Sequence, residues 1–166
     1  AFDECFRFGP STNITRSVFE MYEIDDKKDF SNAIVGKKID STYLIKALFE
    51  HANNGDLPAI SVLETSGEHM ARSIAGVIKE LNIKEPINVI LAGSVWAKAT
   101  NFAMLNKFKK VVCELSNKKS NFIVLKEPPV LGAILWALEL ANGELPDKEL
   151  KAKVLENIIN YQNSIN

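Results

Sequence analysis

The stretch Ile87-Asn88-Val89-Ile90-Leu91-Ala92-Gly93-Ser94-Val95-Trp96 decides how the rest of the chain is interpreted. It is a short, almost entirely apolar run, rich in β-branched residues, that is bounded by Pro86 and by Gly93. This pattern predicts a strand buried on both faces, and such strands belong to parallel sheets covered by helices. Ligands of these sheets bind beyond the carboxyl ends of the strands, which places the expected site at Gly93 and Ser94.

The composition is that of an ordinary globular domain. The 166 residues are 46% hydrophobic and 25% charged, and the formal net charge is -1. Without a strong positive field the chain lacks the long-range attraction to phosphate backbones, so no nucleic-acid partner is expected. No apolar run approaches the ~20 residues that span a bilayer, and the amino terminus has no signal-peptide pattern. We therefore expect a cytoplasmic protein with no membrane partner.

Cysteine and histidine do not form a metal-binding pattern. Cys5 and Cys113 are the only cysteines, each in an apolar context, which favours two reduced cysteines in a cytosolic protein. His51 and His69 are far apart, and neither has a second ligand three or four positions later. No metal site is therefore expected.

Helical patterns come before the opening stretch. Gly9-Pro10 breaks the chain, and Ser11 or Thr12 can then cap a helix that runs to about residue 21. A short helical piece is expected over about 30–35, and Ser41 is expected to cap the helix that follows.

The longest helix is expected over about residues 57–81. Gly55 suits a positive-φ stop for the preceding helix, while Asp56 can cap the long one with Pro58 in its first turn. Gly67 costs about 1 kcal/mol of helix propensity relative to Ala, so we expect another backbone to approach closely there. The apolar stripe expected to face inward is Ile60, Leu63, Gly67, Met70, Ile74, Val77 or Ile78, and Leu81.

Strand and helix alternate after the opening stretch. The pattern predicts a helix over about 99–115, a strand over 121–125, an apolar helix over 130–142 that must be covered on most sides, and an amphipathic helix from Pro146-Asp147. The first of these helices is expected to bury Phe102, Leu105, Phe108 and Val112 and to expose Lys107, Lys109 and Lys110 as a solvated face.

The fold class is therefore α/β, helix-rich with a small parallel sheet. Two strands leave both sheet edges unpaired, and isolated small sheets are marginally stable. We expect the chain to be part of something larger or to pair its sheet with another copy. Its first residue is Ala1 rather than Met, which would fit processing or a cut inside a longer protein.

No complete catalytic constellation can be assembled, because the chain contains no GxxxxGK[ST], GxGxxG, GxSxG or HExxH motif. The informative site is therefore Gly93-Ser94. Glycine at the end of a strand lets a ligand approach the backbone, and the following helix can add free N–H groups and the Ser94 hydroxyl. The alternative is a tight strand-to-helix turn in which Ser94 acts only as a cap.

Three segments, taken in order, point to a family. The first is Gly9–Thr15 (GPSTNIT), and the second is Ala52–Ala59 (ANNGDLPA) with the long helix behind it. The third runs from Val89–Ser94 (VILAGS) to Pro128–Leu138 (PPVLGAILWAL), so that the three cover about residues 9–142. In order and separation they resemble the carboxyl-terminal part of the BadF/BadG/BcrA/BcrD-type ATPase family, which includes N-acetylglucosamine kinase-like proteins.

The resemblance implies the carboxyl-terminal half of an actin/hexokinase/Hsp70-like (ribonuclease-H-like) ATPase fold. In the intact protein, ATP with Mg²⁺ would lie in the cleft between two domains and would phosphorylate an amino sugar such as N-acetylglucosamine. Gly93, Ser94 and Val95 would form one wall of the adenosine pocket, and Gly132 would lie near it or support helix packing between the domains.

Several parts of the family have no counterpart in these 166 residues. They are the phosphate-binding loops, the catalytic Asp region and a second glycine in the turn at Gly93. The chain alone is therefore expected to be inactive and to bind no cofactor. Its expected partners are a missing amino-terminal ATPase half and a small-molecule sugar. No catalytic residue is assigned within the chain.

The expected organisation is a single-domain fragment with a helical insertion at about 9–82, a strand-helix core at about 86–142 and a tail helix over 144–166. Two other functions stay open. One is an ATPase that activates a dehydratase or reductase through an iron–sulfur cluster, although Cys5 and Cys113 do not match its motif. The other is a non-enzymatic helical interaction module that uses the sheet edge or the helix over 130–142. Exposed apolar surface also makes a homodimer plausible.

Overall fold

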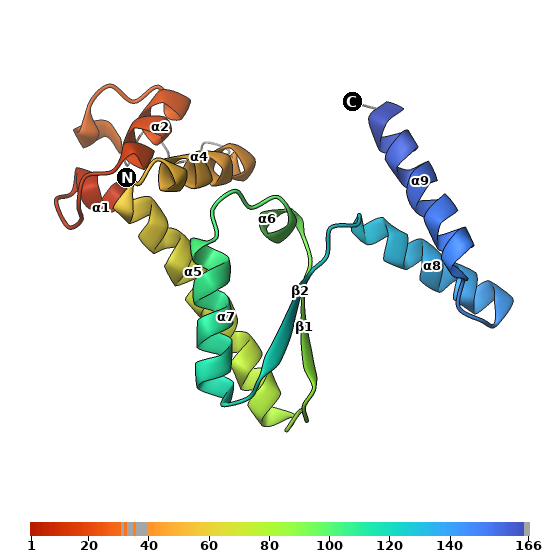
Figure 1. Ribbon diagram of the computed structural model, residues 1–166. Helices are drawn as coiled ribbons and strands as arrows, with labels where there is room; N and C mark the ends of the chain where they lie inside the picture. The colour runs from red at the N-terminus through yellow and green to blue at the C-terminus, as the bar shows by residue number, and fades with distance from the viewer. Residues whose placement is uncertain (31, 33–34, 36–39, 165–166) are drawn as a thin grey trace. The chain divides into compact units, whose positions relative to one another are not determined.

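The computed structural model describes residues 1–30, 32, 35 and 40–164 (Figure 1). The chain forms two compact units, one made of Ala1–Ile87 with Ala99–Asn121 and the other of Asn88–Lys98 with Phe122–Asn166. The helical piece expected over about 30–35 falls largely outside the described residues. The division of the chain into insertion, core and tail stays a prediction.

The first unit is helical. Its elements are α1 (Phe2–Cys5), α2 (Asn13–Tyr22), the 3₁₀ turn η1 (Lys27–Asp29), α4 (Ser41–Asn53), α5 (Leu57–Glu80) and α7 (Ala103–Ser116). Helices α2 and α4 pack on each other, α4 packs on α5, and α5 has its most extensive contact with α7.

Two of the expected helix caps are confirmed. The side chain of Thr12 accepts a hydrogen bond from the amide of Ile14 at 3.2 Å and caps α2. Asp56 caps α5 with Pro58 in the first turn, and Gly55 has the expected positive φ of 82°. Asn, Asp, Ser and Thr serve at such positions because their oxygens accept from amides that have no partner within the helix.

The expected cap of α4 is wrong by one residue. Asp40, and not Ser41, is the N-cap, and its carboxylate accepts from the amide of Tyr43 at 2.9 Å. Ser41 is instead the first helical residue. Asp and Ser are about equally good caps, so the residue types alone do not fix the register.

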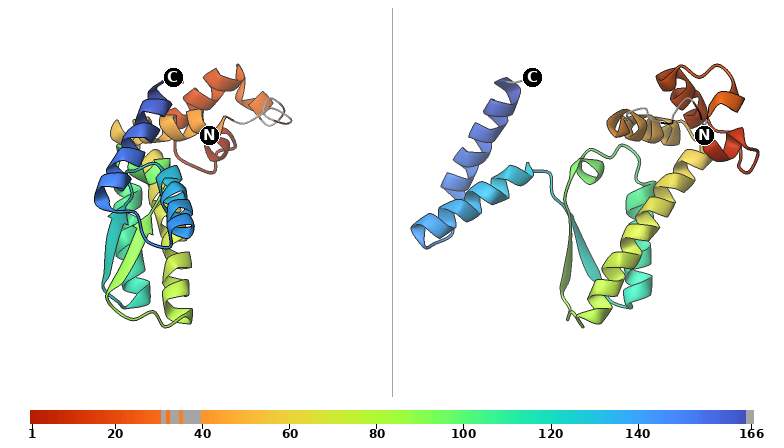
Figure 2. Two further views of the ribbon diagram at one scale, coloured as in Figure 1. Left: turned by 90° about the vertical axis from the view of Figure 1, so that its right-hand side faces the viewer. Right: turned by 180° about the vertical axis from the view of Figure 1, so that it is seen from behind.

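Helices α5 and α7 pack closely and lie side by side (Figures 1 and 2). A Cβ placed on Gly67 would overlap the carbonyl oxygen of Met104 and would lie 3.1 Å from its carbonyl carbon. Both residues are buried. The expectation that another backbone passes Gly67 is therefore confirmed.

The buried face of α5 differs from the expected apolar stripe. Small residues repeat on it every four positions, so α7 can approach closely, and the larger Met70, Val77 and Leu81 point outward. The buried residues are Ala59, Leu63, Gly67, Ala71, Ala75 and Ile78. The expected stripe is confirmed at Leu63, Gly67 and Ile78 and is wrong at Met70, Val77 and Leu81. It missed Ala59, Ala71 and Ala75 because it selected large apolar side chains, while the close contact with α7 also needs small ones.

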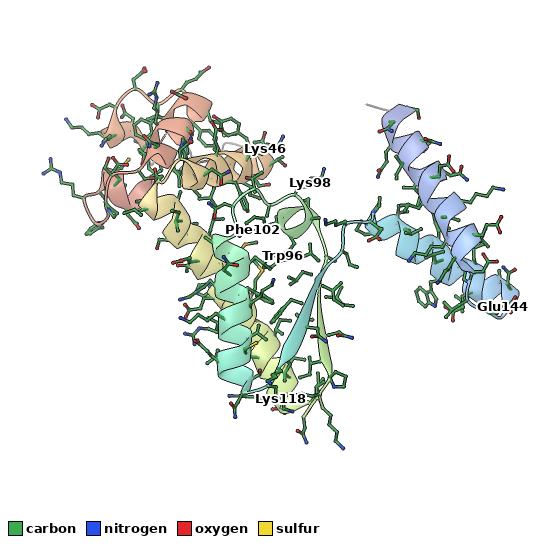
Figure 3. All side chains as sticks on the ribbon, in the orientation of Figure 1. Lys46, Trp96, Lys98, Phe102, Lys118 and Glu144 are labelled. Atoms are coloured by element: carbon green, nitrogen blue, oxygen red, sulfur yellow. The ribbon has the colours of Figure 1, made fainter. Side chains whose placement is uncertain are left out.

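Helix α7 begins at Ala103, later than expected, and its inward face was predicted in part. Phe108 and Val112 are buried as expected, together with Met104 and Val111. Phe102, labelled in Figure 3, precedes the helix as its N-cap residue and is 59% exposed, so its expected burial is wrong.

The second unit contains a small sheet and two long helices. Its elements are β1 (Ile87–Leu91), α6 (Ser94–Ala97), β2 (Ser120–Val124), α8 (Pro129–Asn142) and α9 (Lys148–Ser164), although the first residues of both strands belong to the first unit. Strands β1 and β2 form a two-stranded parallel sheet. The helix-rich α/β class with a small parallel sheet is therefore confirmed.

Strand β1 is covered on one face only. Ile87, Val89 and Leu91 are buried, while Asn88 is exposed and Ile90 is 59% exposed. The expected burial on both faces is wrong because the continuous apolar sequence hides an alternating pattern. One apolar face of the sheet remains open around Ile90 and around Ile123 of β2.

Helix α8 is also less covered than its sequence predicts. It packs on α9, but only Leu131 is buried, and Trp136 and Leu140 are 65% and 71% exposed. The expectation of cover on most sides is wrong for this chain, since α9 contacts one side alone. Among the described helices, none combines the length and apolar character that crossing a membrane requires.

The close contact at Gly67 predicts opposite effects for two glycines of α5. We expect Gly67→Ala to lower the free energy of unfolding by about 1–3 kcal/mol, because the new methyl group meets the Met104 backbone. Gly76→Ala in the same helix should instead raise it by about 0.5–1 kcal/mol, because a Cβ at Gly76 meets open space. Urea unfolding of both variants checks this, and equal effects would contradict the assigned contact.

Candidate functional site

The turn after β1 has a backbone conformation that is essentially restricted to glycine. Gly93 has φ 110° and ψ 160°, and any other residue there costs about 1–3 kcal/mol. Its carbonyl oxygen accepts hydrogen bonds from the amides of Trp96 at 3.2 Å and Ala97 at 3.0 Å, which starts helix α6. The turn expected at the end of the strand is therefore present, and it requires glycine.

The Gly93 turn faces open space. No heavy atom lies within 4 Å of the position that a Gly93 Cβ would take, and Gly93 and Ser94 are both exposed. No side chain caps α6, so the alternative is wrong in making Ser94 the cap, while the tight strand-to-helix turn that it also expected is present. The amides of Ser94 and Val95 lie in the first turn, where a helix offers them no acceptor. The turn thus presents a hydroxyl and amide donors next to free volume.

Helix α6 is too short to add a strong dipole to this turn. It has four residues, whereas the macrodipole of a helix is the sum over many aligned peptide units. Its side chains Trp96 and, just after it, Lys98 are labelled in Figure 3. Recognition at Gly93-Ser94 would therefore rest on individual hydrogen bonds and shape rather than on binding of an anion by a helix end.

Gly132 lies on α8 and is exposed. Among the described residues, no atom outside its own stretch of helix lies within 4 Å of the position that its Cβ would take. Gly93, Ser94 and Val95 are consecutive in one turn, whereas the role expected for Gly132 stays a prediction.

A second polar centre joins the starts of α2 and α5 in the first unit. The carboxylate of Asp56 accepts from the Thr12 hydroxyl at 3.0 Å, from the Asn13 amide at 2.7 Å and from the Ala59 amide at 3.1 Å. Asp56 therefore serves two helix N-termini at once. These bonds also bring together two of the segments on which the family resemblance rests.

Glu4 also accepts hydrogen bonds from the residues at the start of α2. Its carboxylate accepts hydrogen bonds from the Ser11 hydroxyl at 2.9 Å, from the Thr12 amide at 3.2 Å and from the Thr15 hydroxyl. Lys27 lies 3.6 Å away, and the Glu4 side chain is only 14% exposed. The turn over residues 10–13 is thus held between two carboxylates.

Both carboxylates are held in their charged forms. The hydrogen bond from Thr15 is the largest cause that lowers the pKa of Glu4, while burial opposes it, and Ser11, Thr12 and Lys27 lower it further. For Asp56, burial alone would raise the pKa, but the bonds from Asn13, Ala59 and Thr12 outweigh it, so the pKa is lowered. Donors that bond a carboxylate favour its ionised form.

A cavity of about 750 Å³ opens beside this junction. It is lined by Asp3, Pro10, Ser11, Thr12, Asn13, Asp56, Leu57, Pro58, Ser61 and Val62. Its only charged lining residues are Asp3 and Asp56, so it is unsuited to phosphate or other anions. Within the described residues, no group of three His, Cys, Asp or Glu side chains is placed to hold a metal ion.

A serine–histidine pair lies on α2 and α4. The Oγ of Ser17 is 2.8 Å from Nε2 of His51, and both residues are half-buried. In the sequence, His51 stands out only as a possible metal ligand, and nothing marks Ser17. The two residues are 34 positions apart, and neither belongs to a motif that would reveal the pair.

The lysines of α7 behave in part as expected for a solvated face. Lys107 pairs with Glu68 of α5 at 3.2 Å, and Lys110 lies 3.9 Å from Glu114. Glu68 also binds Arg72 at 2.6 Å. Lys107 and Lys110 are therefore each close to a carboxylate, which would compete with a phosphate.

Comparison of the chain with protein-family models, with curated proteins and with solved structures found no match to any of them. The resemblance described above therefore rests on the sequence segments alone.

The Asp56 junction predicts a pH-dependent effect of one substitution. We expect Asp56→Asn to lower the free energy of unfolding by about 1–3 kcal/mol at pH 7, because the new amide group faces N–H and O–H donors. Since the Asp56 pKa is lowered by folding, its charge stabilises the fold above the unfolded pKa of about 4, and this is lost as the pH falls through the folded pKa. The difference in the free energy of unfolding between Asp56→Asn and the parent should therefore become smaller as the pH falls.

Asp40→Asn is the matched control for this measurement. Asp40 caps α4 by accepting a hydrogen bond from the Tyr43 amide, and Asn caps a helix about as well as Asp. We expect a change of only a few tenths of a kcal/mol. Urea unfolding from pH 7 to pH 3 compares the two, and equal losses at pH 7 would show that Asp56 is no more than an ordinary cap.

Proposed function

We propose that this chain is the carboxyl-terminal portion of an ATP-dependent kinase of the BadF/BadG/BcrA/BcrD type, with an actin/hexokinase-like fold. Its substrate would be an amino sugar such as N-acetylglucosamine. The Gly93 turn would form the adenosine side of the ATP cleft. The amino-terminal half of a longer protein would supply the phosphate-binding loops, the Mg²⁺ ligands and the catalytic base.

The backbone of Gly93 is the observation that carries this proposal. Conformations that only glycine adopts cost free energy and cluster at ligand clamps and active sites. This one lies directly after the carboxyl end of a parallel strand, where ligands of α/β sheets bind. It also leaves the space above the turn open. Both properties support a role in binding rather than in packing.

The residues of the turn suit a nucleoside better than a phosphate group. Glycine lets a flat base or a ribose approach the backbone, the Ser94 hydroxyl can hydrogen-bond to it, and Val95 adds a half-buried apolar surface. Gly93, Ser94 and Val95 carry no charge that would neutralise a triphosphate. The turn would therefore position ATP, which supplies the phosphoryl group, and would leave charge stabilisation to the other half.

The contact between Thr12 and Asp56 joins two of the three segments on which the resemblance rests. Thr12 and Asp56, which are 44 positions apart in the sequence, bond directly to each other. Paired motifs of this kind are expected when both belong to one structural unit. In the proposed kinase, the junction would fix the relative positions of α2 and α5.

To test the proposal, the protein encoded by the complete reading frame is expressed and assayed for ATP-dependent phosphorylation of N-acetylglucosamine. We expect activity there and none in the 166-residue chain alone. Gly93→Ala should raise the KM for ATP about tenfold, as a strain of ~1.4 kcal/mol would, with little change in the KM for the sugar.

Gly143→Ala is the control for this experiment. Gly143 also has a positive φ of 77° and open space around its Cβ position, but it lies in the turn that ends α8. Its substitution should lower stability slightly and leave the KM for ATP unchanged. A complete reading frame without ATP-dependent phosphorylation, or activity in the 166-residue chain alone, would count against the proposal.

A second candidate function is that of a non-enzymatic interaction module, which the exposure of α8 favours. Trp136 and Leu140 are mostly exposed on a helix whose only charged residue is Glu139. Large apolar side chains in this position favour association. A partner domain or a second copy of the chain would cover them.

For the chain alone, we expect self-association at micromolar concentration. Leu140→Asp should shift the chain towards monomer, because a carboxylate cannot be buried unpaired in an apolar interface. Leu81→Asp, at the exposed end of α5, should leave association unchanged. Sedimentation velocity measures both, and a parent chain that sediments as a monomer would remove the support for this candidate.

A further inference from the structure

We propose that Ser17 is a nucleophile activated by His51, in a site that is separate from the Gly93 turn and able to take a small carboxylic ester. The pair joins two helices, α2 and α4, that pack on each other (Figure 1). The distance of 2.8 Å between Oγ and Nε2 is that of a nucleophile bonded to its general base. When Nδ1 carries the ring proton, the Ser17 hydroxyl donates to Nε2.

The pair opens onto a cavity that can admit a ligand. The cavity has a volume of about 520 Å³, in the range of small-molecule sites. Its lining is Asn13, Arg16, Ser17, Glu20, Tyr43, Lys46, Ala47, Glu50 and His51.

Two lining residues could stabilise the charge that develops in acyl transfer. Asn13 precedes Ser17 by four positions, so the two share a face of α2, and its side chain can donate hydrogen bonds. Lys46 supplies a positive charge from α4, whereas Arg16 is already paired with Glu20 at 2.8 Å. Donors near a forming oxyanion lower the barrier to acyl transfer.

The charged groups around His51 come from three segments. Arg16 and Glu20 lie on α2, Lys46 and Glu50 on α4, and Asp56 precedes α5. Asp56 and the charged form of His51 attract each other, which contributes to the lowered pKa of Asp56. An imidazolium formed at His51 during the reaction would therefore have a carboxylate near it.

The reaction is balanced with water as the second substrate. Ser17 Oγ bonds to the ester carbonyl carbon while its proton moves to Nε2 of His51. The bond to the leaving alcohol then breaks, and His51 returns the proton to that oxygen. Water attacks the acyl-serine in the same way, which releases the acid and restores the Ser17 hydroxyl.

The test uses the purified 166-residue chain and a fluorophosphonate probe. Ser17 Oγ would bond to phosphorus as the P–F bond breaks, with fluoride leaving and the Oγ proton passing to His51. We expect peptide mass spectrometry to find the label on Ser17 at least tenfold above the exposed Ser41 of α4. The chain should also hydrolyse 4-nitrophenyl acetate, and Ser17→Ala should abolish that hydrolysis.

His51→Gln separates a base from a structural bonding partner. Glutamine can keep a hydrogen bond to Ser17 but cannot take its proton, so labelling should fall at least tenfold while the thermal midpoint changes little. His69→Gln, on the exposed face of α5, is the matched control and should label as the parent does. Absence of label on Ser17, or equal labelling of His51→Gln and the parent, would overturn the proposal. Either result leaves the proposed ATP site unaffected.

Discussion

The passage of the Met104 backbone against Gly67 is the contact on which the first unit depends. A helix pair can approach this closely only where side chains are absent or small, so alanines and a glycine occupy the buried face of α5 at intervals of four. Leu63 and Ile78 are also buried on this helix, whereas Met70 and Val77 lie on its exposed faces. The packing of α5 on α7 thus determines which side chains of the longest helix remain accessible.

The start of α5 carries the second constraint, which is electrostatic. The carboxylates of Asp56 and Glu4 are largely shielded from solvent. Hydroxyl and amide donors of the turn over residues 10–13 replace the hydrogen bonds that water would otherwise make to them. Charge-assisted bonds of this kind are stronger than neutral ones. They hold α2 against α5 and, through the contact of α2 with α4, keep Ser17 next to His51.

Local signals in the sequence predicted the local features of the structure. The cap of α2 was narrowed to Ser11 or Thr12 and that of α5 was predicted to be Asp56. Gly55 was predicted to have a positive φ and Gly67 to be a point of close approach, because each of these features needs a specific residue type. Burial was harder to predict. A strand with Ile at position 90 and a helix with Trp at position 136 look like core elements, yet neither side chain is covered within the chain. The apolar character of a side chain predicts that its burial is favourable, but it does not show which neighbouring element, if any, buries it.

The candidate sites also differ in whether the sequence could predict them. The Gly93 turn could be located from the sequence because a strand end, a glycine and a helix start are consecutive. Ser17 with His51 and Glu4 with Thr15 could not, since their partners come from different helices and carry no shared motif. Sequence separation, rather than chemistry, decided which of these contacts could be predicted.

The positions of the two tryptophans have a practical consequence for spectroscopy. Trp96 is half-buried in α6, directly after the Gly93 turn, and Trp136 is 65% exposed on α8. Indole emission shifts to shorter wavelength when solvent is removed from the ring, so the chain contains two intrinsic fluorescent reporters in different environments. Emission from one follows events at the strand-end turn, and emission from the other follows the covering of the apolar helix.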